Sequence, residues 1–283
     1  MPAGKLGALP PHPEHTHPRV KLASHLDMAT LPPTPAVVDY ASRVRSWPMY
    51  LNDRIGDCTC AGIAHSIQAW TAYGKRLVTL PNSAVLALYE AMGYVPGDPS
   101  TDNGAVEQDV LAYVQKHGIG RHKILAYAQV DHTNPDEMKT ALNLFGSVYL
   151  GAQMPQSAMD QTNAGEPWTP VPGSPIEGGH CFVAQRWDTA AVPMTVVTWG
   201  QLQRVSLDWW ADNGLEAWVI ITKDFFSASG VSGSGVNLAT LGDDFSVVTG
   251  QPNPFRAPAK HKWYCTGLLN KVMPLLDNLR HGK

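Results

Sequence analysis

Cys58 has the position and surroundings of a nucleophile in this sequence. Asp57 precedes it where the N-cap of a helix is expected, so unpaired backbone N–H groups and the helix dipole favour the thiolate. The same N–H groups can bind a developing oxyanion, and Asn52, six positions upstream, can supply a side-chain amide as a second donor. The alternative interpretation is that Cys58 is a small buried apolar residue.

His180 is the candidate general base. It follows Gly178 and Gly179 into an expected strand, which leaves open space around its ring. A cysteine followed more than a hundred residues later by a histidine is the order of a thiol nucleophile activated by imidazole. A hairpin turning over residues 188–193 would bring residues 197–200 across from His180, where Trp199 would cover the ring and exclude water. The alternative is an ordinary histidine at a loop edge.

A metal site is the weaker interpretation of these side chains. Cys58, Cys60 and His65 offer three zinc ligands, but positions two apart on a helix point away from each other. We expect Cys60 and Cys181 to pack in the core, Cys181 on the strand face opposite His180. Three histidines near the N-terminus also have a spacing that an ion could use: His12, His15 and His17. The sequence predicts no metal and no cofactor.

The elements that position these residues change character along the chain. Apolar residues recur at helical spacing over residues 58–73, 106–117 and 136–145, and a further helix is expected to be capped by Asn82 or Ser83. Apolar and β-branched runs predict strands over residues 147–154, 180–187, 194–199 and 215–222. Helices followed by antiparallel strands indicate an α+β fold.

Proline and glycine divide the chain into four parts. Residues 1–35 form a proline-rich arm, either solvated or docked on the surface. Residues 36–226 form one globular unit, with a helical lobe over about 45–146 and a β lobe over about 147–226. Residues 227–250 are a Gly/Ser-rich linker, and residues 251–283 an amphipathic tail.

Composition excludes several functional classes. The chain has 283 residues, with Lys+Arg 21 against Asp+Glu 24, so the formal net charge of -3 argues against nucleic-acid or membrane-surface binding. We expect no signal peptide and no transmembrane segment, because apolar runs are short and the N-terminus is broken by proline. Four cysteines are too few for a disulfide framework. A cytoplasmic or virion-associated protein fits best.

Seven motifs, in the same order along the chain, resemble those of the papain-like cysteine peptidases. The resemblance is to an actinobacterial or phage-type member of that superfamily. The motifs are Val38-Asp39-Tyr40, Asn52 at the place of the oxyanion-hole glutamine, Cys58, the loop Asp102-Asn103-Gly104, the helix and strand of residues 136–154, Gly179-His180 and Trp199-Gly200. Asp57-Cys58 is also similar to the bacteriocin-processing branch. The resemblance implies a two-lobed fold, with Cys58 at a helix N-terminus in one lobe and His180 in an antiparallel, barrel-like β lobe.

The resemblance breaks at the residue that orients the histidine. The orienting asparagine of the family falls on Val197, which cannot hydrogen-bond to imidazole. A shift of one residue brings Thr198 into this role; Gln201 is the next polar candidate, and Asp188 is a more distant one. The predicted catalytic set is therefore Cys58, His180, Asn52 and Thr198.

Three functions follow from these expectations. The first is a cysteine hydrolase that cleaves a peptide or isopeptide bond, including peptidoglycan cross-links, through a thioester. The second is a papain-like scaffold, weak or inactive in catalysis, whose arm and tail hold assembly partners such as those of a phage particle. The third is a transglutaminase-like acyl transfer that uses the same Cys58–His180 pair.

Overall fold

The computed structural model describes residues 2–14, 19, 21–24, 33–74, 76–227, 230–232 and 234–235. Some sequence-based expectations lie outside these residues: a short helix near Leu238, the tail over residues 251–283, Cys265, His15 and His17. Among the described residues, none of the helices combines the length and the apolar character needed to span a bilayer.

The described part of the chain alternates helices with antiparallel strands. The α-helices are α1 (Cys58–Gly74), α2 (Asn82–Ala91), α3 (Glu107–Lys116), α4 (Pro135–Phe145), α5 (Gln156–Ala164) and α6 (Leu207–Asn213). The strands are β1 (Val38–Asp39), β2 (Ile124–Val130), β3 (Val148–Pro155), β4 (Ile176–Trp187), β5 (Met194–Thr198), β6 (Gln201–Val205) and β7 (Gly214–Thr222). Short 3₁₀ turns lie at Leu22–Ser24, Pro99–Thr101 and Lys223–Phe225.

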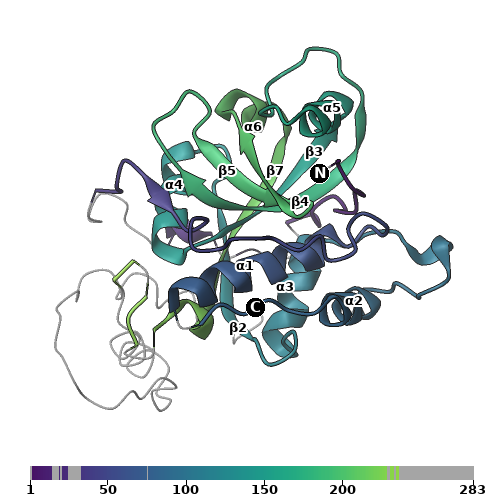
Figure 1. Cartoon of the computed structure of the whole chain (residues 1–283), viewed down its shortest axis with the longest axis horizontal. Coiled ribbons are helices and arrows are strands. Elements are labelled where there is room, and N and C mark those ends of the chain that lie inside the picture. Colours follow the sequence, from purple (N-terminus) through teal and green to yellow (C-terminus); the bar gives the residue numbers. More distant parts are fainter. Residues whose placement is uncertain are drawn as a thin grey trace.

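The strands form one 7-stranded sheet in the order β2-β7-β3-β4-β5-β6, with β1 paired to β4. Every strand pair in it is antiparallel. In Figure 1, α1, α2 and α3 lie below strands β3, β4, β5 and β7, and α4, α5 and α6 lie among the strands above. Two elements from the expected helical range belong to the sheet side: β2 pairs with β7, and α4 packs on β7, β3 and β4. The fold is α+β, as the sequence predicts.

Helix α1 is the centre of the core. It buries 15 of its 17 residues, including Ile63, Ile67 and Trp70. Each such apolar side chain contributes about 1.5–3 kcal/mol on burial. The helix reaches the sheet through Gly62, where an added Cβ would lie 2.8 Å from the Tyr149 ring. The same Cβ would lie 3.2 Å from Cys181 Sγ, so the start of α1 packs against both β3 and β4.

Helix ends show how local the sequence information is. Helix α4 has Asn134 as its N-cap, whose side chain accepts the N–H groups of Asp136 and Glu137, and Gly146 as its C-cap, with a φ of 72°; both are residue types preferred at these positions. The expected cap of α2 was wrong, because Pro81 occupies the N-cap and no side-chain cap bond forms there. The sequence-based assignment also missed β2, β6, α5 and α6, although β2 alternates buried and half-buried residues along its length.

Candidate active site

Cys58 is the first residue of α1, at the boundary between helix and sheet. The Asp57 carbonyl accepts the Ala61 N–H at 2.9 Å, as expected of an N-cap residue. The Cys60 N–H also donates to this carbonyl at 2.9 Å, so the N–H groups left without a carbonyl partner within the helix are those of Cys58 and Thr59. On the other side, the backbone N–H of Cys181 in β4 donates to Cys58 Sγ at 3.4 Å. Cys58 is thus adjacent to the residue that follows His180.

The His180 ring is held in one orientation by two contacts. Its Nε2 hydrogen-bonds to Thr198 Oγ1 at 2.6 Å. Its face stacks on the Trp199 indole, with ring centroids 4.3 Å apart and an interplanar angle of 18°. Its Nδ1 is buried and has no hydrogen-bond partner among the described residues. One ring nitrogen is therefore occupied, and the other is available for a reacting group.

Strand register explains why Thr198, and not Val197, meets His180. Val183 in β4 pairs with Val197 in β5, and Ala184 pairs with Val196. The pairing becomes irregular after Ala184, but before that point side chains alternate regularly, so the even-numbered residues of β4 up to Ala184 and of β5 from Val196 share one face. His180 and Thr198 lie on that face, whereas Val197 points to the other and is fully buried.

The other two candidates for orienting His180 lie elsewhere. Asp188 belongs to the β4–β5 turn, where its carboxylate lies 3.4 Å from Arg186 and 3.8 Å from Arg204. Gln201 begins β6 and pairs with Thr198. Of the polar residues considered from the sequence, Thr198 is the one hydrogen-bonded to the imidazole.

The turn between β5 and β6 delivers Trp199 onto the histidine. Trp199 and Gly200 are the two residues between the paired Thr198 and Gln201, and both have positive φ, 45° and 69°. Positive φ at both positions is required in two-residue hairpins of type I′. For tryptophan this conformation costs about 1–3 kcal/mol, and it persists because the ring is locked against His180.

Asn52 sits in a strained loop just before α1. Tyr50 and Leu51 have positive φ, 54° and 74°, which turns the chain so that the Asn52 side chain faces inward. Its Nδ2 donates to the carbonyl of Ile55 at 3.1 Å and to the carbonyl of Lys5 at 3.2 Å. Asn52 therefore already binds a peptide carbonyl with the amide that the sequence assigned to an oxyanion.

Burial controls the protonation of the site. It raises the pKa of Cys58 to about 12, more than the Cys181 N–H lowers it, and it lowers the pKa of His180 to about 3. It also raises the pKa of the neighbouring Asp57 to about 8. The expectation that the helix N-terminus makes Cys58 a thiolate is wrong in this state, because desolvation outweighs the helix dipole. Thiol and imidazole are both neutral here.

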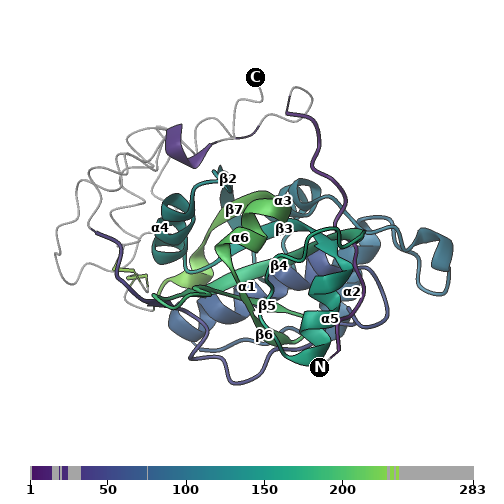
Figure 2. The same ribbon diagram turned by 90° about the horizontal axis from the view of Figure 1, so that it is seen from above.

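The N-terminal residues cover the site. Residues 3–9, which we call the threaded segment, lie between the loop before α1 and the sheet, and Figure 2 shows this end of the chain in dark purple passing α5. The Lys5 carbonyl accepts both the Asn52 amide and the Trp199 indole N–H, the latter at 3.1 Å. Beyond the segment, His12 bonds to Asp109 of α3 at 2.9 Å. The arm is therefore surface-docked over these residues.

A hydrogen-bond network missed by the sequence analysis supports this region. Asp102 Oδ1 accepts the Gly56 N–H at 2.8 Å and the Tyr89 hydroxyl at 2.7 Å. The same hydroxyl accepts the Gly104 N–H at 2.9 Å. Tyr89 belongs to α2, and nothing in the spacing of that helix predicts these bonds. Glu107 begins the helix expected over residues 106–117; we expect a charged helix residue to be solvated, but Glu107 is fully buried.

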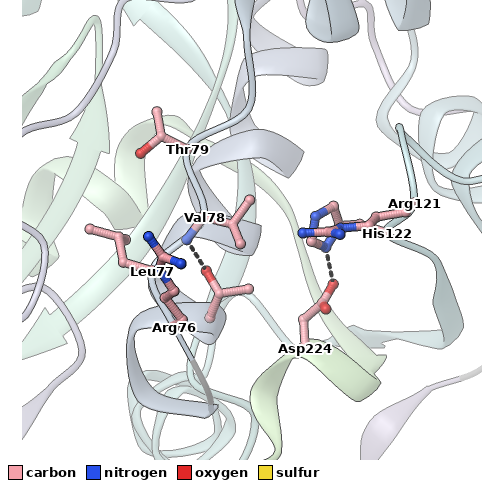
Figure 3. Close-up of a pocket in the computed structure, with 8 residues that line it drawn as sticks. Arg76, Leu77, Val78, Thr79, Arg121, His122 and Asp224 are labelled. Atoms are coloured by element: carbon pink, nitrogen blue, oxygen red, sulfur yellow. Dashed lines mark hydrogen bonds and ion pairs between the residues drawn. The ribbon is translucent and has the colours of Figure 1, made fainter.

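A separate cavity lies at the opposite end of α1, about 20 Å along the helix from Cys58. It has a volume of about 570 Å³ and is lined by side chains that include Arg76, Arg121 and a hydrogen-bonded pair, His122 and Asp224, 2.8 Å apart (Figure 3). The Thr71 hydroxyl there is already bonded to Ile67 and Val78. The Thr71 hydroxyl is therefore not free to act as a nucleophile for this pair. Nowhere in the described residues do three or more metal-ligating side chains cluster.

Solved structures with the same fold are cysteine proteases and their precursors. Xylellain, a cysteine protease from Xylella fastidiosa, is 15% identical with a TM-score of 0.60, covering 78% of this chain and 97% of its own. The procathepsin B of Trypanosoma congolense is 11% identical with a TM-score of 0.54, covering 76% and 86%. No protein-family profile and no curated sequence matches the chain. Together with the geometry above, these structures show that the chain has the papain-like fold.

Proposed function

We propose that this chain is a cysteine hydrolase that cleaves a peptide or isopeptide bond. The observation that carries the proposal is that the two ring nitrogens of His180 have different environments. Its Nε2 is held by Thr198, its Nδ1 is unpartnered, and the next residue in β4 donates to the sulfur of Cys58. A ring fixed at one nitrogen and available at the other is what a general base for a thiol requires.

The first step forms a thioester. When Nε2 carries its proton toward Thr198, Nδ1 is an unprotonated acceptor. Cys58 Sγ attacks the substrate carbonyl carbon as its proton passes to Nδ1. The oxyanion is bound by the Cys58 N–H and by the side-chain amide of Asn52, which already donates to the Lys5 carbonyl in the same way.

The second step hydrolyses the thioester and regenerates the free enzyme. The C–N bond breaks as His180 gives its proton to the leaving amine. A water molecule then attacks the thioester, its proton passes to His180, and the carboxylic acid leaves while Cys58 regains its thiol. Thr198 is neutral, so it orients the imidazole without the full charge stabilisation that a carboxylate would give the imidazolium.

The closed state of the site also favours a second candidate. A scaffold that keeps the fold without catalysis would tolerate a fully buried thiol, such as that of Cys58. In this alternative, we propose that the arm and the tail bind assembly partners. An acyl transferase differs from the hydrolase only in the acceptor, an amine in place of water, so product analysis separates the two.

The test is hydrolysis by the full chain, both as wild type and as the Gly7→Leu variant described below. Unfolded casein and cross-linked peptidoglycan are incubated separately, and new amino groups are counted. We expect release that Cys58→Ala abolishes and that Cys60→Ala, a matched change at a fully buried cysteine, preserves. Equal release by Cys58→Ala contradicts the mechanism. If neither the wild type nor the Gly7→Leu variant releases amino groups, the result favours the scaffold. Incorporation of a labelled amine into the substrate favours the transferase.

A further inference from the structure

The threaded segment is bound mainly through its main chain. Gly7 and Ala8 donate their N–H groups to the carbonyl of Gly179, each at 3.0 Å. Leu9 donates to the Ala105 carbonyl at 3.0 Å, and the Ala105 N–H donates back to Gly7 at 2.8 Å. These reciprocal bonds form a parallel β-bridge between Ala8 and Ala105. The segment is thus an added strand held from both sides, which is how peptides are recognised by β-augmentation.

Two further anchors lie toward the start of the segment. Ala3 donates its N–H to the side chain of Asn163 at 2.8 Å, and Lys5 donates to the carbonyl of Asn52 at 2.6 Å. The Lys5 side chain itself is exposed, so the contact depends on the backbone. The bonds therefore define a register of the segment without selecting most of its side chains.

Glycines provide the selection. A Cβ added to Gly7 would lie 1.9 Å from the Gly56 carbonyl oxygen and 2.7 Å from Gly56 Cα. On the opposite wall, a Cβ at Gly104 would lie 2.1 Å from the Gly7 carbonyl, and one at Gly179 would lie 2.2 Å from the Ala8 carbonyl. All of these contacts are with backbone, which cannot move aside as a flexible side chain can. Both the segment and its walls lack side chains where they cross.

We infer that residues 3–9 are a peptide ligand carried by the chain for its own candidate active site, and that this site accepts only glycine at the position of Gly7. The walls that enforce glycine are fixed, because Asp102 and Tyr89 bond the N–H groups of Gly56 and Gly104. The ligand class is an extended peptide with a glycine between small or apolar residues, such as Leu6 and Ala8. Bound in this register, the segment keeps Cys58 covered.

The role of the segment in regulation rests on the proposed hydrolase function, whereas its role as a ligand does not. Release of the segment would expose Cys58, the Asn52 amide and Trp199 together. The same residues that hold the Lys5 carbonyl would then be available to another peptide. The segment therefore makes the site latent and also indicates what the site binds.

The test measures the labelling rate of each cysteine by N-ethylmaleimide in the full chain, read by peptide mass spectrometry. Gly7→Leu is expected to speed labelling of Cys58 by about tenfold or more, because the side chain cannot fit beside Gly56. Leu9→Ala is the matched control, since it changes an exposed side chain of the same segment, and it is expected to leave the rate unchanged. Cys60 and Cys181, both buried, report on unfolding and should stay slow in every variant.

A synthetic peptide of residues 2–11 completes the test. Added to the Gly7→Leu chain, it is expected to slow Cys58 labelling again, while the same peptide with leucine at position 7 is not. Labelling of Cys58 at the wild-type rate in Gly7→Leu overturns the inference. Fast labelling of Cys58 in Gly7→Leu, without hydrolysis of any substrate, supports the inference and contradicts the proposed hydrolase function.

Hydrogen exchange on the wild type keeps the inference testable if Gly7→Leu unfolds and all three cysteines react together. The bonded amides of Gly7, Ala8 and Leu9 are expected to exchange about a hundredfold more slowly than in the free peptide. The amide of Leu6, for which no hydrogen bond is seen, is the internal reference. Exchange of all four at the rate of the free peptide overturns the inference.

Discussion

The side-chain amide of Asn52 donates a hydrogen bond to the main-chain carbonyl of Lys5 at 3.2 Å. The two residues are far apart in the sequence, and no side-chain preference of Lys5 contributes to the contact. An amide that binds a peptide carbonyl next to Cys58 is a group that can bind a developing oxyanion. The same bond also holds the threaded segment over the site, so one amide group takes part in both the proposed catalysis and the covering of Cys58.

Asn52→Ala is expected to change two measurements in opposite directions. It removes an oxyanion donor, which lowers kcat by about 10² to 10³. It also removes a bond to the threaded segment, which raises the rate of Cys58 labelling. Steady-state kinetics and labelling are measured on the same preparation. A variant in which labelling rises and kcat is unchanged contradicts the assignment of Asn52 to the oxyanion.

Thr198→Val is expected to lower kcat/KM by about 10-fold to 100-fold, because the isosteric side chain leaves His180 Nε2 without its partner. Thr198→Ser keeps the hydroxyl and should retain most of the activity. The pH profile separates orientation from packing, since loss of the hydrogen bond moves the limb that reports His180. Equal activities of the valine and serine variants would show that the hydroxyl does not orient the base.

Tyr89→Phe is expected to loosen the wall around the threaded segment. The change removes a hydroxyl that bonds Asp102 at 2.7 Å and Gly104 at 2.9 Å. The loss of about 1 kcal/mol corresponds to about fivefold faster Cys58 labelling. Tyr94→Phe is the matched control, because the Tyr94 ring stacks on Tyr89 and no hydrogen bond of its hydroxyl is seen among the described residues. Equal rates of Cys58 labelling in the two variants would show that the Tyr89 hydroxyl does not stabilise the wall around the threaded segment.

Buried histidines should make the fold sensitive to acid. Burial lowers the pKa of His65 to about 4, so its folded form favours the neutral ring and its contribution to stability is complete above the ordinary pKa of 6.5. That contribution, about 3 kcal/mol, is lost as the pH falls from 6.5 toward 4. Urea unfolding at several pH values measures it. His65→Gln should flatten the slope in this window, and exposed His117→Gln should not; equal slopes in the two variants contradict the account.

Local features of the fold could be predicted from the sequence. The start of α1 at Cys58, the Asn134 cap and Gly146 stop of α4, and the β4–β5 hairpin each depend on a few adjacent residues. The resemblance of seven short motifs also gave the correct fold. Thr198 was placed first among three candidates for orienting His180, and its hydrogen bond to the ring depends on strand register, which the sequence does not give.

The rest depended on contacts between distant residues. The arm could be predicted to be extended, but its bonds use backbone groups that carry no sequence pattern. The buried position of Glu107 and the roles of Tyr89 and Asp102 arise from packing between elements. The protonation of Cys58 was predicted in the wrong direction for this state, because the sequence shows the helix terminus and not the burial of the thiol.

The pH dependence of iodoacetamide labelling at Cys58, in the Gly7→Leu chain with and without His180→Ala, tests the central claim most directly. A thiol with an ordinary pKa titrates near about 8.5. With the segment displaced, we predict fast labelling of Cys58 near pH 6 that His180→Ala abolishes, while Cys60 stays unreactive. If Cys58 titrates at or above the ordinary value and His180→Ala changes nothing, Cys58 and His180 do not form a catalytic pair.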